Sequence, residues 1–161
     1  MREAVIVSTA RTPIGKAFRG AFNDTQAQEM AGHAIAEAVK RSKVSKEEID
    51  DVIIGAAGQQ GSQQGNIARQ SLLRAGLPVS VAGMSLDRQC ASGMMAIATA
   101  AKEITEDGMT ITVGGGVESV SLVRNENFRM DRARDPWLEE NIPALYMLSL
   151  IHISEPTRRP I

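Results

Sequence analysis

This sequence contains few cysteines and few aromatic residues, and neither sign of charge is in clear excess. Cys90 is the only cysteine among 161 residues, so the chain cannot form an internal disulfide. The two histidines, His33 and His152, lie far apart and do not have the spacing of zinc ligands. Aromatic residues make up 3% of the chain and its net charge is -1. These absences argue against a disulfide scaffold, a zinc domain and a nucleic-acid-binding protein.

The sequence also lacks a long hydrophobic run. The first apolar stretch ends before Arg11, which makes it too short for a signal peptide, and no other stretch approaches membrane-spanning length. We therefore expect a cytoplasmic protein with a reduced thiol and no membrane partner. The length and the apolar fraction of 43% suit one folded domain with a real core.

Short apolar runs alternate with helical patterns over the first two thirds of the chain. The runs at 4–9, 52–56, 81–86 and 110–113 predict four strands. The segments between them predict helices from about 25 to 43, from 66 to 75 and from 90 to 106. The last of these is apolar almost all round, which is typical of a buried helix. This order predicts an α/β fold with a mostly parallel sheet and helices on both faces.

The character of the sequence changes after Ser119. The stretch 124–134 is charged and irregular, and Pro136 and Pro143 interrupt the residues beyond it. We interpret residues 1–119 as the core domain and residues 120–147 as the start of an excursion from the sheet.

Cys90 is the main candidate for chemistry, and the residues leave two interpretations open. A free cysteine is usually a small, buried packing residue. This one, however, follows the predicted strand 81–86 at the first turn of a helix, where ligands bind in parallel α/β sheets. Unpaired N–H groups and the helix dipole favour a thiolate there. Ala91, Ser92 and Gly93 also leave room beside the sulfur for a substrate carbonyl.

Four short motifs carry a resemblance to a known family. They are, in chain order, RTPIG (11–15), GNIARQ (65–70), DRQCASG (87–93) and GGVES (115–119). Together they resemble the thiolases, which include acetyl-CoA acetyltransferases and 3-ketoacyl-CoA thiolases. The resemblance implies a thiolase-like layered fold, truncated in the loop domain, with a sheet that lacks its last strand.

The same resemblance implies a function. Cys90 would attack the 3-keto carbonyl of a 3-ketoacyl-CoA and carry the acyl group as a thioester, and the reverse reaction is a Claisen condensation. Acyl-CoA and coenzyme A would be substrates, with no further cofactor and no metal. The family forms homodimers or homotetramers, which we expect for the full-length protein. It takes its activating histidine, second cysteine and asparagine from the carboxy-terminal half, so we expect this chain alone to be inactive. His33 has no motif around it, and we interpret it as structural.

Residues 148–161 depart from the thiolase pattern. We interpret them as the translation of a sequencing adapter, and we expect the natural part of this sequence to end at about Met147. Such a segment is set aside in reasoning about the fold.

Two alternatives to a thiolase stay open. A ketosynthase of the same superfamily also uses a cysteine at a helix start, although its surroundings resemble TACSS rather than RQCASG. A non-enzymatic α/β domain with an inert, buried Cys90 is the other alternative. The glycines 114–116 do not form a dinucleotide-binding motif, because Ser119 stands where the third glycine is needed. Close backbone packing is their ordinary explanation.

Overall fold

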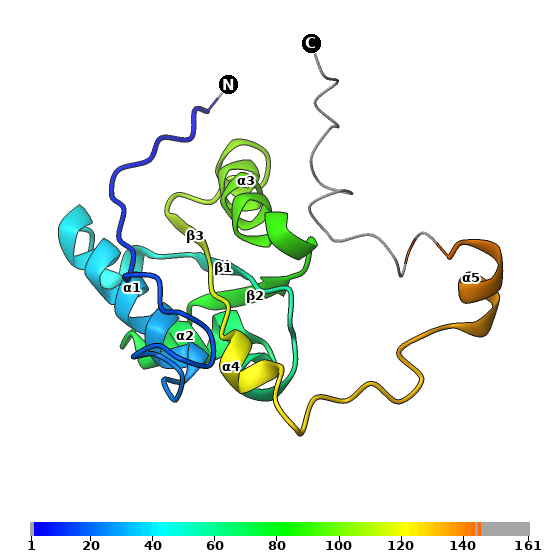
Figure 1. Ribbon diagram of the computed structural model, residues 1–161. Helices are drawn as coiled ribbons and strands as arrows, with labels where there is room; N and C mark the ends of the chain where they lie inside the picture. Colours follow the sequence, from blue (N-terminus) through cyan, green and yellow to red (C-terminus); the bar gives the residue numbers. More distant parts are fainter. Residues whose placement is uncertain (1, 144, 146–161) are drawn as a thin grey trace, which may run out of the picture.

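The chain forms an α/β layered fold, shown in Figure 1, in a computed structural model that describes residues 2–143 and 145. The helices are α1 (Ala27–Ser42), α2 (Ile67–Arg74), α3 (Ser92–Thr105), α4 (Val120–Val123) and α5 (Pro136–Asn141). The strands are β1 (Asp51–Gly55), β2 (Ala82–Leu86) and β3 (Thr112–Gly116). Short 3-10 turns occupy Lys46–Glu48, Gly61–Gln63 and Gln89–Ala91.

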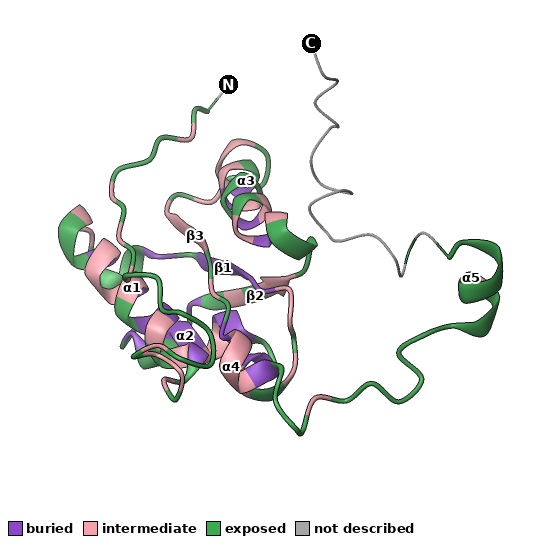
Figure 2. Ribbon diagram, in the orientation of Figure 1, coloured by how far each residue is buried: buried purple, intermediate pink, exposed green. Residues whose placement is uncertain are grey.

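The sheet is parallel and has β1 at its centre. Its order is β2-β1-β3, and Asp51 of β1 lies opposite Ala82 on one side and Thr112 on the other. All five residues of β1 are buried. Its side chains alternate, so that Val52 and Ile54 join the core formed with α1 and α2, whereas Ile53 packs with α3. Figure 2 shows this buried band between the two helical layers. The predicted fold class is therefore confirmed, and the strand predictions at 52–56, 81–86 and 110–113 hold to within three residues.

The predicted strand at 4–9 is wrong. This segment is not a strand, and Val5, Ile6 and Val7 are at least 70% exposed. The reason lies in its position: an apolar groove lies between the segment and β3, and no ladder joins the segment to the outer edge of β2 or β3 in the described part of the chain. Polar contacts hold its ends instead: the Ser8 hydroxyl donates to the Ala38 carbonyl oxygen at 2.8 Å, and Arg2 donates to the 108–109 turn.

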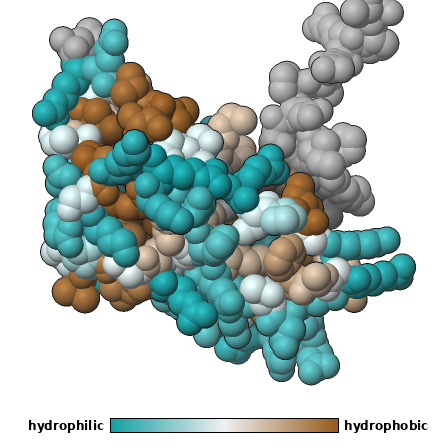
Figure 3. Space-filling view, turned by 90° about the vertical axis from the view of Figure 1, so that its left-hand side faces the viewer, coloured by the Kyte–Doolittle hydropathy of each residue, from teal (hydrophilic) through white to brown (hydrophobic). Residues whose placement is uncertain are grey.

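An apolar groove accompanies this segment. It has a volume of about 670 Å³ and is lined by residues 4–10, α1, α3 and the length of β3. Figure 3, which faces the side of the molecule that carries the N-terminal segment and α1, shows hydrophobic surface gathered in its upper part. β-branched residues that the sequence assigns to the core thus line a groove at its surface.

The third helix is buried on one side only, which corrects the expectation of an entirely buried helix. Ala96 and Ala100 face the sheet and are at most 5% exposed, whereas Met94 is 77% exposed. The side facing away from the sheet stays open among the residues that the structure describes.

The chain leaves the sheet after β3. The short helix α4 packs beside the 61–63 turn, and an exposed, irregular stretch leads to α5, which Figure 1 shows away from the layers. The division at residue 119 stays a prediction, and the segment 148–161 lies outside the described residues. In the described part of the chain, no helix combines the length and the apolar character that crossing a membrane requires.

Candidate active site

Cys90 lies between β2 and α3, at the carboxyl edge of the sheet, and it is exposed. It sits in the 3-10 turn Gln89–Ala91 rather than in the first turn of the α-helix, which begins at Ser92. The helix thus begins two residues later than the predicted start at residue 90. Cys90 is also not buried, as the non-enzymatic alternative supposes, because the structure exposes this residue.

Side chains that flank Cys90 create this tight turn. The Asp87 carboxylate accepts a hydrogen bond from the Gln89 N–H at 2.6 Å. The buried Ser92 hydroxyl accepts from the Arg88 N–H at 2.8 Å and donates to the Gln89 carbonyl oxygen at 2.6 Å. Gln89 has a φ of 53°, a left-handed conformation that is uncommon outside glycine. The residues before and after Cys90 therefore hold it in a defined turn.

A cavity of about 460 Å³ opens beside Cys90. Its lining consists of 55–58 after β1, the 89–93 turn without Ala91, 116–118 after β3, and three residues at α4 (Val120, Val123 and Arg124). Most of the lining residues nearest the sheet are glycine or alanine. The site therefore lies where parallel α/β sheets bind ligands, with space for a small group next to the sulfur.

Glycine-mediated contacts hold the start of α3 against the sheet. A Cβ atom on Gly116 would lie 2.9 Å from the Gly93 Cα atom, and one on Gly114 would lie 2.7 Å from the Ile97 Cα atom. No side chain fits into such a contact. Close backbone packing therefore explains Gly114 and Gly116, whereas a Cβ atom on Gly115 would meet only the Ile54 side chain, at 3.7 Å.

Glu118 connects the loop after β1 to the loop after β3. Its carboxylate accepts hydrogen bonds from the Ala57 N–H at 2.9 Å and the Gly58 N–H at 3.3 Å. It also accepts from the Gln63 side-chain amide at 2.7 Å, and Gln63 accepts in turn from the Ser119 N–H. Gln63 is 1% exposed. No local signal indicates this role, because a polar, glycine-rich stretch predicts an exposed loop and the partner of Gln63 lies 55 residues away.

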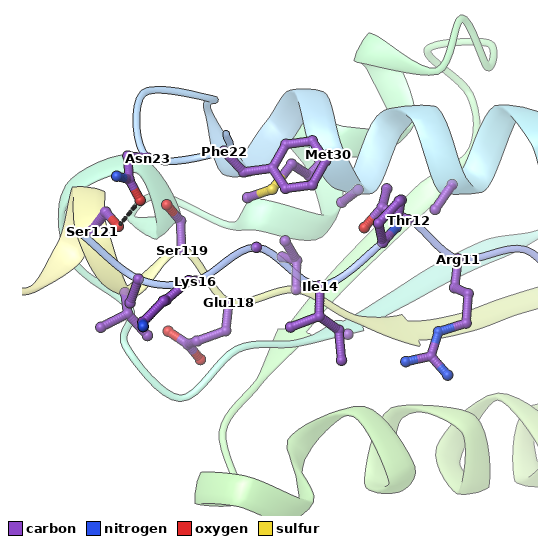
Figure 4. A pocket seen from close by; sticks show the side chains of 18 of the residues that line it. Arg11, Thr12, Ile14, Lys16, Phe22, Asn23, Met30, Glu118, Ser119 and Ser121 are labelled. Carbon is purple, nitrogen blue, oxygen red and sulfur yellow. Dashed lines mark hydrogen bonds between the residues drawn. The ribbon is translucent and has the colours of Figure 1, made fainter. Parts of the chain in front are cut away.

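A second cavity, of about 350 Å³, lies on the other side of the segment 116–120 (Figure 4). The motif RTPIG lines it together with Phe22 and Met30. In Figure 4 the Glu118 and Ser119 side chains point to opposite sides of the chain. Ser121 accepts from the Phe18 N–H at 2.9 Å and donates to Asn23, so it joins α4 to the loop that follows the motif. The RTPIG motif therefore has a structural place next to the Cys90 cavity.

The motif GNIARQ ties α2 to its neighbours. Asn66 has a φ of 61° and caps α2 by accepting from the Arg69 N–H at 3.0 Å, as its position before the helix predicts. Its side chain also donates to the Gly83 carbonyl oxygen of β2 and accepts from the Ser85 hydroxyl. This motif contributes stability and the placement of β2, the strand that leads to Cys90.

Of His33 and the charged stretch 124–134, one residue, Arg124, lines the Cys90 cavity. His33 is exposed on α1 and lines neither of the two cavities described above, and His152 lies outside the described residues. Arg124 lines the Cys90 cavity and lies over the Phe128 ring at 5.6 Å, whereas Arg129 pairs with Asp131. The described residues contain no cluster of three or more His, Cys, Asp or Glu side chains fit for a metal ion.

Residues 4–142 match the family model described as the thiolase N-terminal domain. The chain belongs to the thiolase family. It is 38% identical over 157 residues to a 3-ketoacyl-CoA thiolase of Bacillus subtilis, which covers 96% of this chain and 39% of the relative. It is 41% identical over 122 residues to a beta-ketoadipyl-CoA thiolase of Pseudomonas putida, which covers 75% and 30% of the two chains. The family resemblance carried by the four motifs is therefore confirmed.

A solved thiolase-family structure shares the fold. The crystal structure of the Bacillus anthracis acetyl-CoA acetyltransferase matches with a TM-score of 0.70 and 41% identity, covering 75% of this chain and 30% of that one. The chain thus spans between 30% and 39% of the length of these thiolases. It represents the thiolase N-terminal domain, which contains the exposed cysteine and its cavity.

Proposed function

We propose that the complete protein is an acyltransferase that cleaves 3-ketoacyl-CoA, or runs the reverse Claisen condensation, through an acyl-thioester on Cys90. One observation carries this proposal: in a thiolase N-terminal domain, the only cysteine is exposed and faces a cavity at the carboxyl edge of the sheet, where glycine and alanine after β1 leave space beside the sulfur. A nucleophile must be accessible and must leave room for the carbonyl that it attacks.

The proposed reaction balances in two steps. The Cys90 thiolate attacks the 3-keto carbon, and the resulting alkoxide collapses as the C2–C3 bond breaks. The electron pair of that bond goes to C2 of the departing acetyl-CoA, which then takes up a proton. The thiolate of coenzyme A next attacks the thioester carbonyl, which releases acyl-CoA and restores the Cys90 thiolate. Coenzyme A and acyl-CoA are substrates here, and the reaction needs neither a metal nor a further cofactor.

We propose that the carboxy-terminal half of the full-length protein supplies the remaining groups of this scheme. Proton transfer at C2 requires an acid or base, and the alkoxide requires hydrogen-bond donors. His33, the histidine within the described residues, does not line the Cys90 cavity. We therefore propose that the 161-residue chain does not turn over by itself and that the full-length protein works as a homodimer or homotetramer.

The test is thiolysis of acetoacetyl-CoA by the full-length protein, with mass spectrometry of the trapped acyl-enzyme. The expected result is turnover, an acyl adduct on Cys90, and loss of both in Cys90→Ser. Absence of thiolysis in the parent, or unchanged turnover in Cys90→Ser, would refute the proposal.

A further inference from the structure

The wall of the Cys90 cavity that faces the sheet consists largely of backbone. Gly55, Ala56, Ala57 and Gly58 follow one another at the end of β1 and all line the cavity. Their side chains are at most a methyl group. A bound acyl group would therefore touch the peptide units of this wall, and the position of the backbone itself sets the width of the cavity.

That wall has a specific anchor. Both carboxylate oxygens of Glu118 bind it, one to the Ala57 N–H at 2.9 Å and the other to the Gly58 N–H at 3.3 Å. Hydrogen bonds from backbone N–H groups to a charged acceptor are stronger than those between neutral groups. Two bonds to adjacent peptide units fix both the distance of the wall from Glu118 and its orientation.

Gln63 and Ser119 hold the Glu118 carboxylate in place. Gln63 donates to the Glu118 carboxylate at 2.7 Å and to the Gly58 carbonyl oxygen at 2.7 Å, and it accepts from the Ser119 N–H. Gln63 and Ser119 are buried, so this amide has little freedom to turn. The Glu118 side chain therefore has one preferred orientation, although the residue itself is exposed.

We propose that Glu118 is a positioning residue for acyl transfer: it holds the 57–58 backbone at the distance from Cys90 that the acyl group requires. This inference rests on the proposed function. Glu118 acts through the wall and does not take part in bond making. Its removal is expected to slow the acylation of Cys90 while the intrinsic reactivity of the thiol stays the same.

The network allows a swap of donor and acceptor groups. In Glu118→Gln, the new amide N–H₂ group must face an N–H donor, either of the wall or of Gln63. In Gln63→Glu, two carboxylates face each other and the Gly58 carbonyl oxygen loses a donor. In the double variant, the amide introduced at position 118 can donate to the carboxylate introduced at position 63 and still accept from the Ala57 N–H. That carboxylate also accepts from the Ser119 N–H, so the swap restores part of the network.

The experiment measures two rates for Cys90 in the full-length protein: acylation by acetoacetyl-CoA in a single turnover, and alkylation by iodoacetamide. We expect Glu118→Gln and Gln63→Glu each to lower the acylation rate roughly 10- to 100-fold, since misplacement by about 1 Å has effects of this size. Alkylation should stay within about twofold of the parent, because Glu118 bonds Ala57, Gly58 and Gln63 and makes no hydrogen bond to the sulfur in the described structure. The double variant should recover part of the acylation rate. Glu126→Gln, the same change at an exposed site, should match the parent in both rates.

Three outcomes overturn the inference. Acylation at the parental rate in Glu118→Gln shows that the anchor is dispensable. An equal fall in acylation and alkylation shows a general structural defect instead of positioning. A double variant that is acylated more slowly than both single variants shows that exchanging the two groups does not restore the hydrogen-bond network. If the parent itself forms no acyl-enzyme, the proposed function fails and this inference with it.

Amide hydrogen exchange in the 161-residue chain tests the anchor without any reaction. The Ala57 and Gly58 amides should be protected in the parent and exchange at least roughly tenfold faster in Glu118→Gln, because each loses a charged acceptor. Equal exchange in the two proteins contradicts the anchoring role.

Discussion

Gly55 and Ser92 are in direct backbone contact, since a Cβ atom added to Gly55 would lie 2.2 Å from the Ser92 carbonyl carbon. The end of β1 therefore meets the start of α3 without any side chain between them. Because Ser92 also shapes the turn that holds Cys90, this contact places the cysteine relative to the sheet.

Alanine substitutions along the glycine contacts should separate tight positions from open ones. Gly55→Ala and Gly114→Ala insert a methyl group into backbone contacts of 2.2 and 2.7 Å, so each should lower the free energy of unfolding by about 3 kcal/mol or prevent folding. Gly115→Ala is the matched control, because its methyl group would meet only the Ile54 side chain, at 3.7 Å. Urea denaturation of the three variants decides the point, and an equally unstable Gly115→Ala would contradict it.

The contacts that build this fold differ in how far they reach along the chain. The sequence predicts β1 and the cap at Asn66 well, because apolar runs and capping residues are local signals. The segment 4–9 has an equally good local signal, but a strand also needs a partner edge within hydrogen-bonding distance, and here a groove lies between the segment and β3. The role of Gln63 could not be predicted for the same reason, since only the fold brings it to Glu118.

The position of Cys90 is predicted in part by the local sequence and in part only by contacts that the structure shows. The motif DRQCASG places the cysteine correctly between a strand and a helix. The 3-10 turn around it depends on the Ser92 hydroxyl and the Asp87 carboxylate, whose hydrogen bonds compete with regular helix formation. The helical spacing of apolar residues does not indicate that these side-chain hydrogen bonds displace the first turn of the helix.

Asn66 should contribute more to stability than an ordinary helix cap. Asn66→Ala removes the cap on Arg69 and the bond to Gly83, and it leaves a non-glycine residue at a φ of 61°. We expect a loss of about 2–3 kcal/mol in the free energy of unfolding. Asn66→Gly loses the same bonds but removes the backbone strain, so it should lie between the parent and Asn66→Ala. Thermal and urea unfolding check the order, and an Asn66→Gly less stable than Asn66→Ala would contradict it.

Two buried carboxyl groups at the far end of the sheet should make stability depend on pH. Burial raises the pKa of Asp51 above its ordinary 3.8, and burial, then the charges of Asp51 and Asp107, raise the pKa of Glu103 above 4.5. A raised pKa means that the folded state binds the proton more tightly than the unfolded state. The stabilisation is therefore fully present below the ordinary pKa and is lost as the pH rises through the raised one.

Glu103→Gln should remove much of that dependence. The variant stays uncharged, so its free energy of unfolding should fall less than that of the parent between about pH 4 and pH 7. Glu106→Gln, which changes an exposed residue at the end of the same helix, should behave like the parent. Asp50 acts in the opposite direction, because hydrogen bonds from Thr110 and Ile111 lower its pKa and its contribution is lost towards acid. Identical pH profiles for Glu103→Gln and the parent would contradict the assignment to Glu103.

Cys90 should be accessible in the folded chain. Its exposure predicts that iodoacetamide labels the native 161-residue protein at a rate within roughly tenfold of the urea-unfolded protein, because a buried thiol would be protected by the free energy of unfolding. The measurement follows the modified Cys90 peptide by mass spectrometry over time, and Cys90→Ser provides the blank.

Ser92→Ala removes the hydroxyl that bonds Arg88 and Gln89, so the turn should loosen and the labelling rate should move towards that of the unfolded chain. Gly115→Ala, whose added methyl group would meet only the Ile54 side chain, at 3.7 Å, should leave the rate unchanged. Labelling that occurs only after unfolding would contradict the exposed turn, and with it the room for a carbonyl beside the sulfur.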